Sequence, residues 1–397
     1  MAHVPTPIIP TGALPPGVRR RRYLAALGLA GATGLAGCAG YQGTEMPTRS
    51  PTPEPMQVGD VTLPVDGSEL VTAIHPDGIP AITDPAFGED WRDWSAVPAE
   101  HRPPREERPT LPEEFPVVGV EREGAARAYP LAVLDWHEVV NERFGGPLLV
   151  TYCPLCGSAV VAERLVDGEP TVFGVSGKLW RNDLVLYDRA TESLWSQLLA
   201  TAIQGPKTGT QLRLFPSTLA SWGEWRTAHP ETRVLLPPPG SVAIGGRREQ
   251  VPDYGDSKYG YESQSQLVGF DREGEGLTER TLVAGVEHEG VARAYPFSEG
   301  RAADVVNDRV GGLPVVVALA PGGSLVAYER RVEGETLRFA SADDRHLRAG
   351  GSRWERTTGR AVDGPYAGLR LSRTAAGSTM FWSAWSAFHP ATEVYGG

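Results

Sequence analysis

The chain repeats part of itself at a fixed spacing, and this repeat constrains its fold more than any other feature of the sequence. Three segments return without a gap at an offset of 166 residues: 119–130 as 285–296, 139–146 as 305–312, and 162–173 as 328–339. A W-x-x-W-x-x-x-H-P motif then returns at an offset of 160 residues. Self-similarity of this kind predicts two tandem units of the same topology, the second slightly shorter than the first.

The repeat and the composition around it divide the 397 residues into five predicted segments. They are a signal at 1–37, a tether at 38–60, a first unit at 61–237, a linker at 238–280 and a second unit at 281–397. The tether is rich in Pro and Thr and has no apolar period, which is typical of an extended, flexible linker.

Short apolar runs separated by turn residues dominate both units. Acidic-residue–glycine pairs at 123–124 and 167–168 lie between two such runs, which favours β-hairpins. Two short helices are also expected, one over 131–141 and one over 217–229, the latter capped by Ser217 or the threonine after it. The predicted fold class is therefore α+β and strand-dominated, with two tandem related β-rich units.

The first residues of the chain resemble an export signal. Arg19 to Arg22 form a basic block before a short, Gly-rich apolar run, as in twin-arginine signals. The run is shorter than the roughly 20 apolar residues that a membrane-spanning helix needs. Leu-Ala-Gly-Cys at 35–38 resembles a lipobox, so Cys38 is the predicted lipidation site. We expect an exported lipoprotein, anchored by lipid to the outer face of the cytoplasmic membrane.

The charge of the chain restricts its partners. The formal net charge is -11, and only three lysines occur. Nucleic-acid binding requires a basic surface, so we exclude a nucleic acid as partner. The membrane is the expected partner through the lipid anchor, and the sequence identifies no protein partner.

The second unit lacks three residues that the first unit has. The offset pairs Cys153, Cys156 and His137 with Leu319, Gly322 and Ala303, in that order. Neighbouring residues persist, for example Arg127 as Arg293. The joint loss suggests that the two thiols and the imidazole form one site. His229 and His389 occur in both copies and are predicted to pack against neighbours or to cap helices.

A Cys-x-x-Cys pair places two sulfurs on one turn, where they can hold one metal ion. Cys153, Cys156 and His137 would supply three ligands to zinc, or to copper(I), which prefers soft thiolates. A fourth position would be open to water, a substrate or a carboxylate. Candidates to line such a site are Glu138, Ser176, Asp183, Asp188, Ser196 and Gln197. Metal binding or metal handling is the first functional hypothesis.

Two other functions remain open for the same cysteines. A thiol–disulfide oxidoreductase would use Cys153 and Cys156 as its redox pair, with a neighbouring positive group lowering the thiol pKa. A structural disulfide in a non-catalytic cell-surface binding module is the third possibility, because exported proteins meet oxidising surroundings. The loop between the cysteines is very short, and short loops contribute little stabilisation. The sequence identifies no catalytic residue and leaves open whether the protein is an enzyme.

Six motifs of the first unit occur in a fixed order and are similar to those of a known family. They are ARAYPL, WHEVVN, TYCPLCGSA, FGVSGKLW, DLVLYDRATESLWSQ and HPETRVL. On these motifs the chain resembles domain-of-unknown-function family 3179 over about residues 117–235, with a degenerate second copy at about 283–395. The resemblance implies a domain assignment and export from a bacterial or archaeal cell. It implies no reaction.

Overall fold

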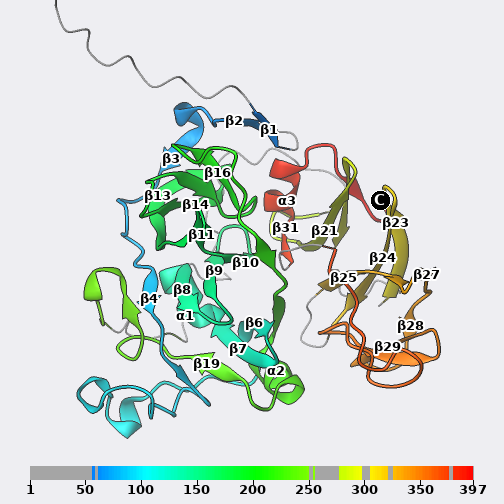
Figure 1. Ribbon diagram of the computed structural model, residues 1–397, viewed down its shortest axis with the longest axis horizontal. Helices are drawn as coiled ribbons and strands as arrows, with labels where there is room; N and C mark the ends of the chain where they lie inside the picture. The colour runs from blue at the N-terminus through cyan, green and yellow to red at the C-terminus, as the bar shows by residue number, and fades with distance from the viewer. Residues whose placement is uncertain are drawn as a thin grey trace, which may run out of the picture. The chain divides into compact units, whose positions relative to one another are not determined.

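The computed structural model describes residues 56–58, 61–249, 254, 277–296, 305–320, 325–374 and 379–396. Of these residues 46% are in strands and 11% in helices, in a propeller-like arrangement. The strands form small, mostly antiparallel sheets (Figure 1). The predicted strand-dominated class is confirmed. The predicted signal, Cys38, Ala303 and Gly322 lie outside the described residues. None of the helices in the described ranges has the length and apolar composition needed to cross a membrane.

Three sheets build the first unit. In order across the sheet, the first contains β18 (Thr218–Ser221), β6 (Pro116–Arg122), β7 (Ala125–Pro130), β19 (Arg233–Leu235) and β5 (Phe87–Gly88). The second contains β17 (Leu214–Phe215), β10 (Ser158–Glu163), β9 (Pro147–Cys153), β8 (Val139–Arg143), β4 (Ile82–Asp84) and β20 (Val242–Ala243). The third contains β16 (Thr201–Gln204), β15 (Leu194–Ser196), β14 (Asp183–Asp188), β13 (Phe173–Trp180) and β3 (Leu70–Thr72).

Smaller elements complete the first unit. Two-stranded sheets are formed by β1 (Met56–Val58) with β2 (Val61–Leu63) and by β11 (Leu165–Val166) with β12 (Glu169–Pro170). The short 3-10 turns are η1 (Gly67–Glu69), η2 (Ala99–His101), η3 (Arg105–Glu107) and η4 (Ile244–Gly246).

The second unit is built from smaller sheets. One contains β31 (Met380–Phe381), β21 (Leu282–His288), β22 (Val291–Pro296) and β32 (Glu393–Val394). The next contains β23 (Val305–Val310), β24 (Leu313–Leu319) and β25 (Leu325–Glu329). The others contain β28 (Ala340–Ser341), β29 (His346–Ala349) and β30 (Ser352–Glu355), and the pair β26 (Arg331–Val332) and β27 (Glu335–Thr336).

Hairpins of the two units have matching registers. In the first unit Val117 pairs with Pro130 across β6 and β7, and in the second Val283 pairs with Pro296 across β21 and β22. A short parallel strand, β19 or β32, then pairs with the second strand of each hairpin. The predicted turn at 123–124 is confirmed, since both of its residues have positive φ. Turn chemistry that is local in sequence therefore fixes these hairpins.

Two of the three α-helices test the sequence predictions directly. Helix α1 (Leu131–His137) begins where predicted but ends four residues earlier than expected. Glu138 is in the left-handed conformation (φ 56°), which ends the helix, and β8 follows at once. Helix α2 (Trp222–Ala228) begins later than predicted. Its cap is Ser221, which forms a capping box with Glu224. The preceding residues instead pair with β6 as β18, because a sheet partner outweighs their helix propensity.

Helix α3 (Trp382–Phe388) has the same place in the second unit as α2 has in the first. The histidine after each helix caps it through its backbone N–H and packs its ring against a helix tryptophan. The ring centroids of Trp225 and His229 lie 4.1 Å apart, and those of Trp385 and His389 lie 3.9 Å apart. Both histidines thus have the packing and capping role that the sequence predicts.

Part of the predicted linker packs into the first unit. Strand β20 pairs with β4, and the side chain of Tyr254 is 2% exposed within the main hydrophobic core. A second buried cluster holds Cys153, Cys156 and the side chain of Trp195. This cluster also includes Ala384 from α3, so the second unit contributes directly to the packing around the two cysteines.

Candidate functional site

The two cysteines lie on the tight turn between β9 and β10. Strand β9 ends at Cys153 and β10 begins at Ser158, which is paired with Cys153. The backbone N–H of Cys156 donates to the carbonyl of Cys153 (3.1 Å), and Gly157 has φ +59°. Cys153 and Cys156 form a disulfide, and each is 1% exposed. The turn therefore presents one closed, buried sulfur pair at the end of two inner strands of the sheet.

A second turn faces these sulfurs from the neighbouring sheet. Arg181 and Asn182 connect β13 to β14 with φ of 53° and 65°. This conformation brings the Asn182 carbonyl oxygen to 3.4 Å from the Cys156 Sγ and 3.8 Å from the Cys153 Sγ. The next residue, Asp183, places its Oδ1 at 3.9 Å from the Cys156 Sγ. A carboxyl group thus lies beside the second cysteine of the pair.

The Asp183 carboxyl is fully buried and held in place. It accepts a hydrogen bond of 2.5 Å from the Ser196 hydroxyl, and the backbone N–H of Leu198 lies 3.3 Å from both of its oxygens. Burial raises the pKa of Asp183 to about 7, and these hydrogen bonds oppose that shift. The group therefore changes its protonation near neutral pH, next to a sulfur pair.

A buried polar network supports the same turn from its other side. The Ser158 hydroxyl donates to the Gln197 side-chain oxygen (3.1 Å), and the Gln197 side-chain nitrogen donates to the Thr151 hydroxyl (3.0 Å). The Thr151 hydroxyl in turn donates to the Val160 carbonyl (2.9 Å). Each of the three side chains is at most 2% exposed, so these bonds fix the sheet on which the cysteine turn is built.

The second unit covers the cysteine turn. The backbone N–H of Phe381 donates to the Cys156 carbonyl (2.7 Å). The Phe381 ring lies so close to Gly157 that a Cβ there would be 2.9 Å from it. Nearby, the guanidinium of Arg181 donates to the carbonyl of Ala387 (3.0 Å). The sulfurs are therefore enclosed by residues from both units.

The predicted Cys2His cluster is not the one that the structure forms. The His137 ring nitrogens lie 2.7 Å from the Pro80 carbonyl (Nδ1) and 3.1 Å from the Tyr254 hydroxyl (Nε2). Both partners come from outside the repeated segments. The ligand atoms that do lie within 4.8 Å of one another belong to Cys153, Cys156 and Asp183. His137 is not a member of that group, and Asp183 takes the third place.

The other predicted lining residues divide into two sets. Ser196 and Gln197 lie beside the turn as expected and bind Asp183 and Ser158. Ser176 instead occupies a bulge in β13, where its hydroxyl donates to the Val185 carbonyl (2.5 Å). Asp188 binds the Trp195 indole N–H (2.9 Å) and the loop that follows β14. Glu138 ends α1, and its carbonyl accepts from the Tyr152 N–H. Ser176, Asp188 and Glu138 therefore stabilise the frame of the unit.

The corresponding place in the second unit is filled by an arginine. Trp195 pairs with Leu186, and Trp354 pairs in the same way with Leu347. The residue two positions after each tryptophan is Gln197 in the first unit and Arg356 in the second. The guanidinium of Arg356 is buried. It donates to the carbonyls of Leu319 (2.8 Å) and Asp343 (3.2 Å) and to the Ser341 hydroxyl. Leu319 is the counterpart of Cys153.

Three features of the site were not found by sequence reasoning. The Asn182 carbonyl belongs to the main chain and has no side-chain signal. Thr151 and Ser158 lie within the TYCPLCGSA motif, which gave a signal that could have identified them. The cover by Phe381 has a long-range origin, because 225 residues separate it from Cys156 and no local pattern predicts it.

Comparison with known proteins identifies a family and nothing closer. A family model described as "Protein of unknown function (DUF3179)" matches residues 76–392. The match is longer than the predicted range of 117–235 and extends through the second unit. No curated protein and no solved structure matches the chain.

Proposed function

The chain belongs to the DUF3179 family of proteins of unknown function, and from the geometry of the cysteine turn we propose that its first unit is a thiol–disulfide oxidoreductase. One observation carries the proposal: the Asp183 Oδ1 lies 3.9 Å from the Cys156 Sγ in a buried site. A disulfide that only stabilises the fold requires no carboxyl group beside it, and burying one is costly. A disulfide that exchanges needs a group that accepts and returns a proton.

The proposed reaction exchanges two electrons and two protons with a dithiol. A partner thiolate attacks the Cys153 Sγ, the Cys153–Cys156 bond breaks, and a mixed disulfide forms at Cys153. The Cys156 thiolate that leaves takes the proton of Asp183. The second partner thiolate then attacks the partner's own sulfur in the mixed disulfide and releases Cys153. The partner becomes a disulfide, and its two protons end on Cys153 and, through Asp183, on Cys156.

Access is the main requirement for this reaction. Each cysteine is 1% exposed, and the contact of Phe381 with Gly157 lies over the turn. Exchange therefore requires this contact to open. The short β31 pairs with β21 at only two positions, so few sheet bonds hold this part of the cover.

The test compares variants by the rate at which dithiothreitol reduces the disulfide between pH 5 and pH 9. Asp183→Asn should slow reduction by about 100-fold, the order expected for loss of a general acid. It should also remove an inflection near pH 7 from the profile. Asp167→Asn, an exposed carboxylate on another turn, is the matched control and should leave both unchanged. Equal rates and profiles in all three proteins would leave a structural disulfide as the function of the pair.

A metal site is the second candidate, and one observation favours it. The ligand atoms of Cys153, Cys156 and Asp183 lie within 4.8 Å of one another. In the reduced protein two thiolates and one carboxylate could bind zinc or copper, with one position open. Elemental analysis of protein purified under reducing conditions, paired with a free-thiol count, distinguishes the candidates. About one ion per chain, lost in Asp183→Asn, would favour the metal.

Two further proposals concern the whole chain. The matching hairpin registers and the sequence offset support an origin of the two units by duplication, after which the second lost the site. The arginine block and the Leu-Ala-Gly-Cys motif support export and lipid attachment at Cys38, with the membrane as partner. Disulfide exchange is compatible with such a location, because exported proteins meet oxidising surroundings.

A further inference from the structure

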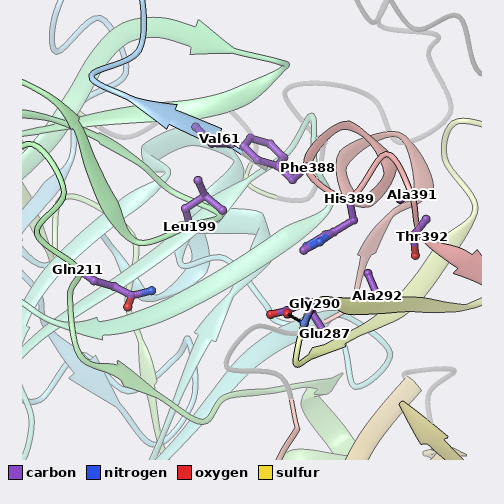
Figure 2. A pocket seen from close by; sticks show the side chains of 10 residues that line it. All are labelled: Val61, Leu199, Gln211, Glu287, Gly290, Ala292, Phe388, His389, Ala391 and Thr392. Atoms are coloured by element: carbon purple, nitrogen blue, oxygen red, sulfur yellow. Dashed lines mark hydrogen bonds between the residues drawn. The ribbon is translucent and has the colours of Figure 1, made fainter. Parts of the chain in front are cut away.

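Two neighbouring cavities lie between the two units, close to the cysteine turn. Their volumes are about 340 and about 250 Å³. Five residues line both of them: Leu199, Gln211, Glu287, Phe388 and His389. Figure 2 shows the first cavity, with the His389 ring projecting from the end of α3 toward the hairpin that carries Glu287. Because they share these side chains, the two cavities adjoin each other, and we treat them together as one binding space.

The chemistry of the lining selects a class of ligand. Val61, Leu199 and Phe388 supply an apolar wall, on the opposite side of the cavity from Glu287 (Figure 2). The Glu287 carboxylate is positioned by the N–H of Gly290 (3.1 Å) at the tip of the β21–β22 hairpin. No lysine or arginine is found among the described residues that line either cavity. His389 is the basic side chain among these lining residues, and its neutral ring leaves the carboxylate charge uncompensated by a lysine or arginine. Such a carboxylate favours a ligand that carries an ammonium group on a short apolar body.

The inner end of the space reaches the packing around the disulfide. Ser158 and Leu198 line the smaller cavity. Ser158 is paired with Cys153, and the N–H of Leu198 contacts the Asp183 carboxyl. Ala384 lines the same cavity and belongs to the buried cluster that contains both cysteines. A ligand held by Glu287 at one end would therefore extend toward the sulfurs at the other.

We propose that this space binds low-molecular-weight disulfides that carry an amino group, with the ammonium at Glu287 and the sulfur–sulfur bond at the Ser158 end. The inference rests on the proposed oxidoreductase function, since the bound disulfide is the oxidant of the reduced pair. One cysteine thiolate attacks the ligand disulfide, forms a mixed disulfide and releases one ligand thiolate. The other cysteine thiolate then attacks the mixed disulfide, forms the Cys153–Cys156 bond and releases the second. The two cysteine protons end on the two ligand thiols.

Two reagents of equal length and opposite charge test the selection. Cystamine and 3,3′-dithiodipropionate both have two-carbon arms on a disulfide, ending in ammonium and carboxylate groups. Each reagent is mixed with the reduced full chain, and the loss of free thiols gives the rate of oxidation. The rate at which each reagent oxidises dithiothreitol gives the reference for its intrinsic reactivity. The cystamine-to-dithiodipropionate rate ratio should exceed that of the reference by about tenfold, the size of one favourable ionic contact. Glu287→Gln should abolish the excess, whereas Glu169→Gln, on exposed β12, should retain it.

A binding measurement separates failure of this inference from failure of the proposed function. Hexane-1,6-diamine has the length and charge of cystamine without the disulfide, and calorimetry measures its binding to the full chain with Cys153→Ser and Cys156→Ser. Binding that Glu287→Gln removes supports the cavity whatever the redox result. No binding at millimolar diamine, or a rate ratio equal to that of dithiothreitol, overturns the proposed ligand. Failure of both disulfides to oxidise the thiols, despite diamine binding, overturns the oxidoreductase function alone.

Discussion

Replacing Asp183 with asparagine should change how the stability of the protein depends on pH. Burial raises the pKa of this carboxyl to about 7, against an ordinary value of 3.8 in the unfolded chain. Between these two values the folded state holds a proton that the unfolded state has released. The contribution of Asp183 to folding is therefore largest below about pH 4. It falls as pH rises and levels off above about pH 7.

The size of the effect follows from the two pKa values. One pKa unit corresponds to about 1.4 kcal/mol, so the free energy of unfolding should lose about 3 kcal/mol between pH 5 and pH 8 through this group. Asp183→Asn removes the titration. In the variant an amide replaces the carboxyl group that accepts the 2.5 Å hydrogen bond from Ser196. The variant should therefore be less stable than the parent at pH 5. The difference should shrink by about 3 kcal/mol at pH 8.

Urea denaturation of both proteins at pH 5, 6, 7 and 8 measures the effect, with the disulfide kept intact. The quantity to follow is the difference between parent and variant, because all other titrating groups cancel in it. Asp167→Asn provides a control whose difference from the parent should not change with pH. Parallel pH curves for parent and Asp183→Asn would refute the reasoning, since they would mean that this carboxyl has the same pKa in both states.

Three other predictions concern the turn, its cover and the location of the protein. Gly157→Ala should destabilise the chain by about 2 kcal/mol in urea denaturation. An L residue is strained at φ +59°, and its Cβ would meet the Phe381 ring. An unchanged midpoint of unfolding would contradict this. Phe381→Ala should speed reduction of the disulfide by a bulky phosphine, followed by thiol counting, because it opens the contact over the turn; a rate equal to the parent's would show that the cover does not control access. Cys38→Ser should move the protein from the membrane fraction to the soluble exported fraction, and a protein that keeps Met1 and stays in the membrane fraction would show that the motif is not a lipobox.

Local features of the fold could be predicted from the sequence, and contacts between distant segments could not. The hairpin turn at 123–124 follows from residues that tolerate positive φ, and α1 begins where its apolar spacing predicts. Helix α2 begins later than its sequence predicts because Thr218 pairs with Gly119 in β6, a strand far away in sequence. Helix propensity cannot foresee a sheet partner at that distance.

The candidate site shows the same division between local features, which the sequence predicts, and contacts between distant segments, which it does not. Comparing the two copies found both cysteines, and the motif that contains Asp183 supplied the third member of the group. The sequence groups His137 with them because none of the three residues is present at the corresponding position of the second unit. Its ring instead binds Pro80 and Tyr254, which lie outside the repeat. Joint loss identifies residues that depend on features of one unit, but it does not give the direction of a side chain.

The buried guanidinium of Arg356 makes the difference between the two units hard to reverse. Leu319→Cys would place a thiol on a residue whose carbonyl accepts a hydrogen bond from the buried Arg356 guanidinium, which also binds the Asp343 carbonyl. Arg356→Gln alone would remove those bonds without supplying new ones, at a cost of about 3 kcal/mol. Arg356→Gln made alone is therefore unfavourable, although the same change made together with others need not be. A variant meant to carry a sulfur pair in the second unit would therefore need Arg356 and Leu319 replaced together.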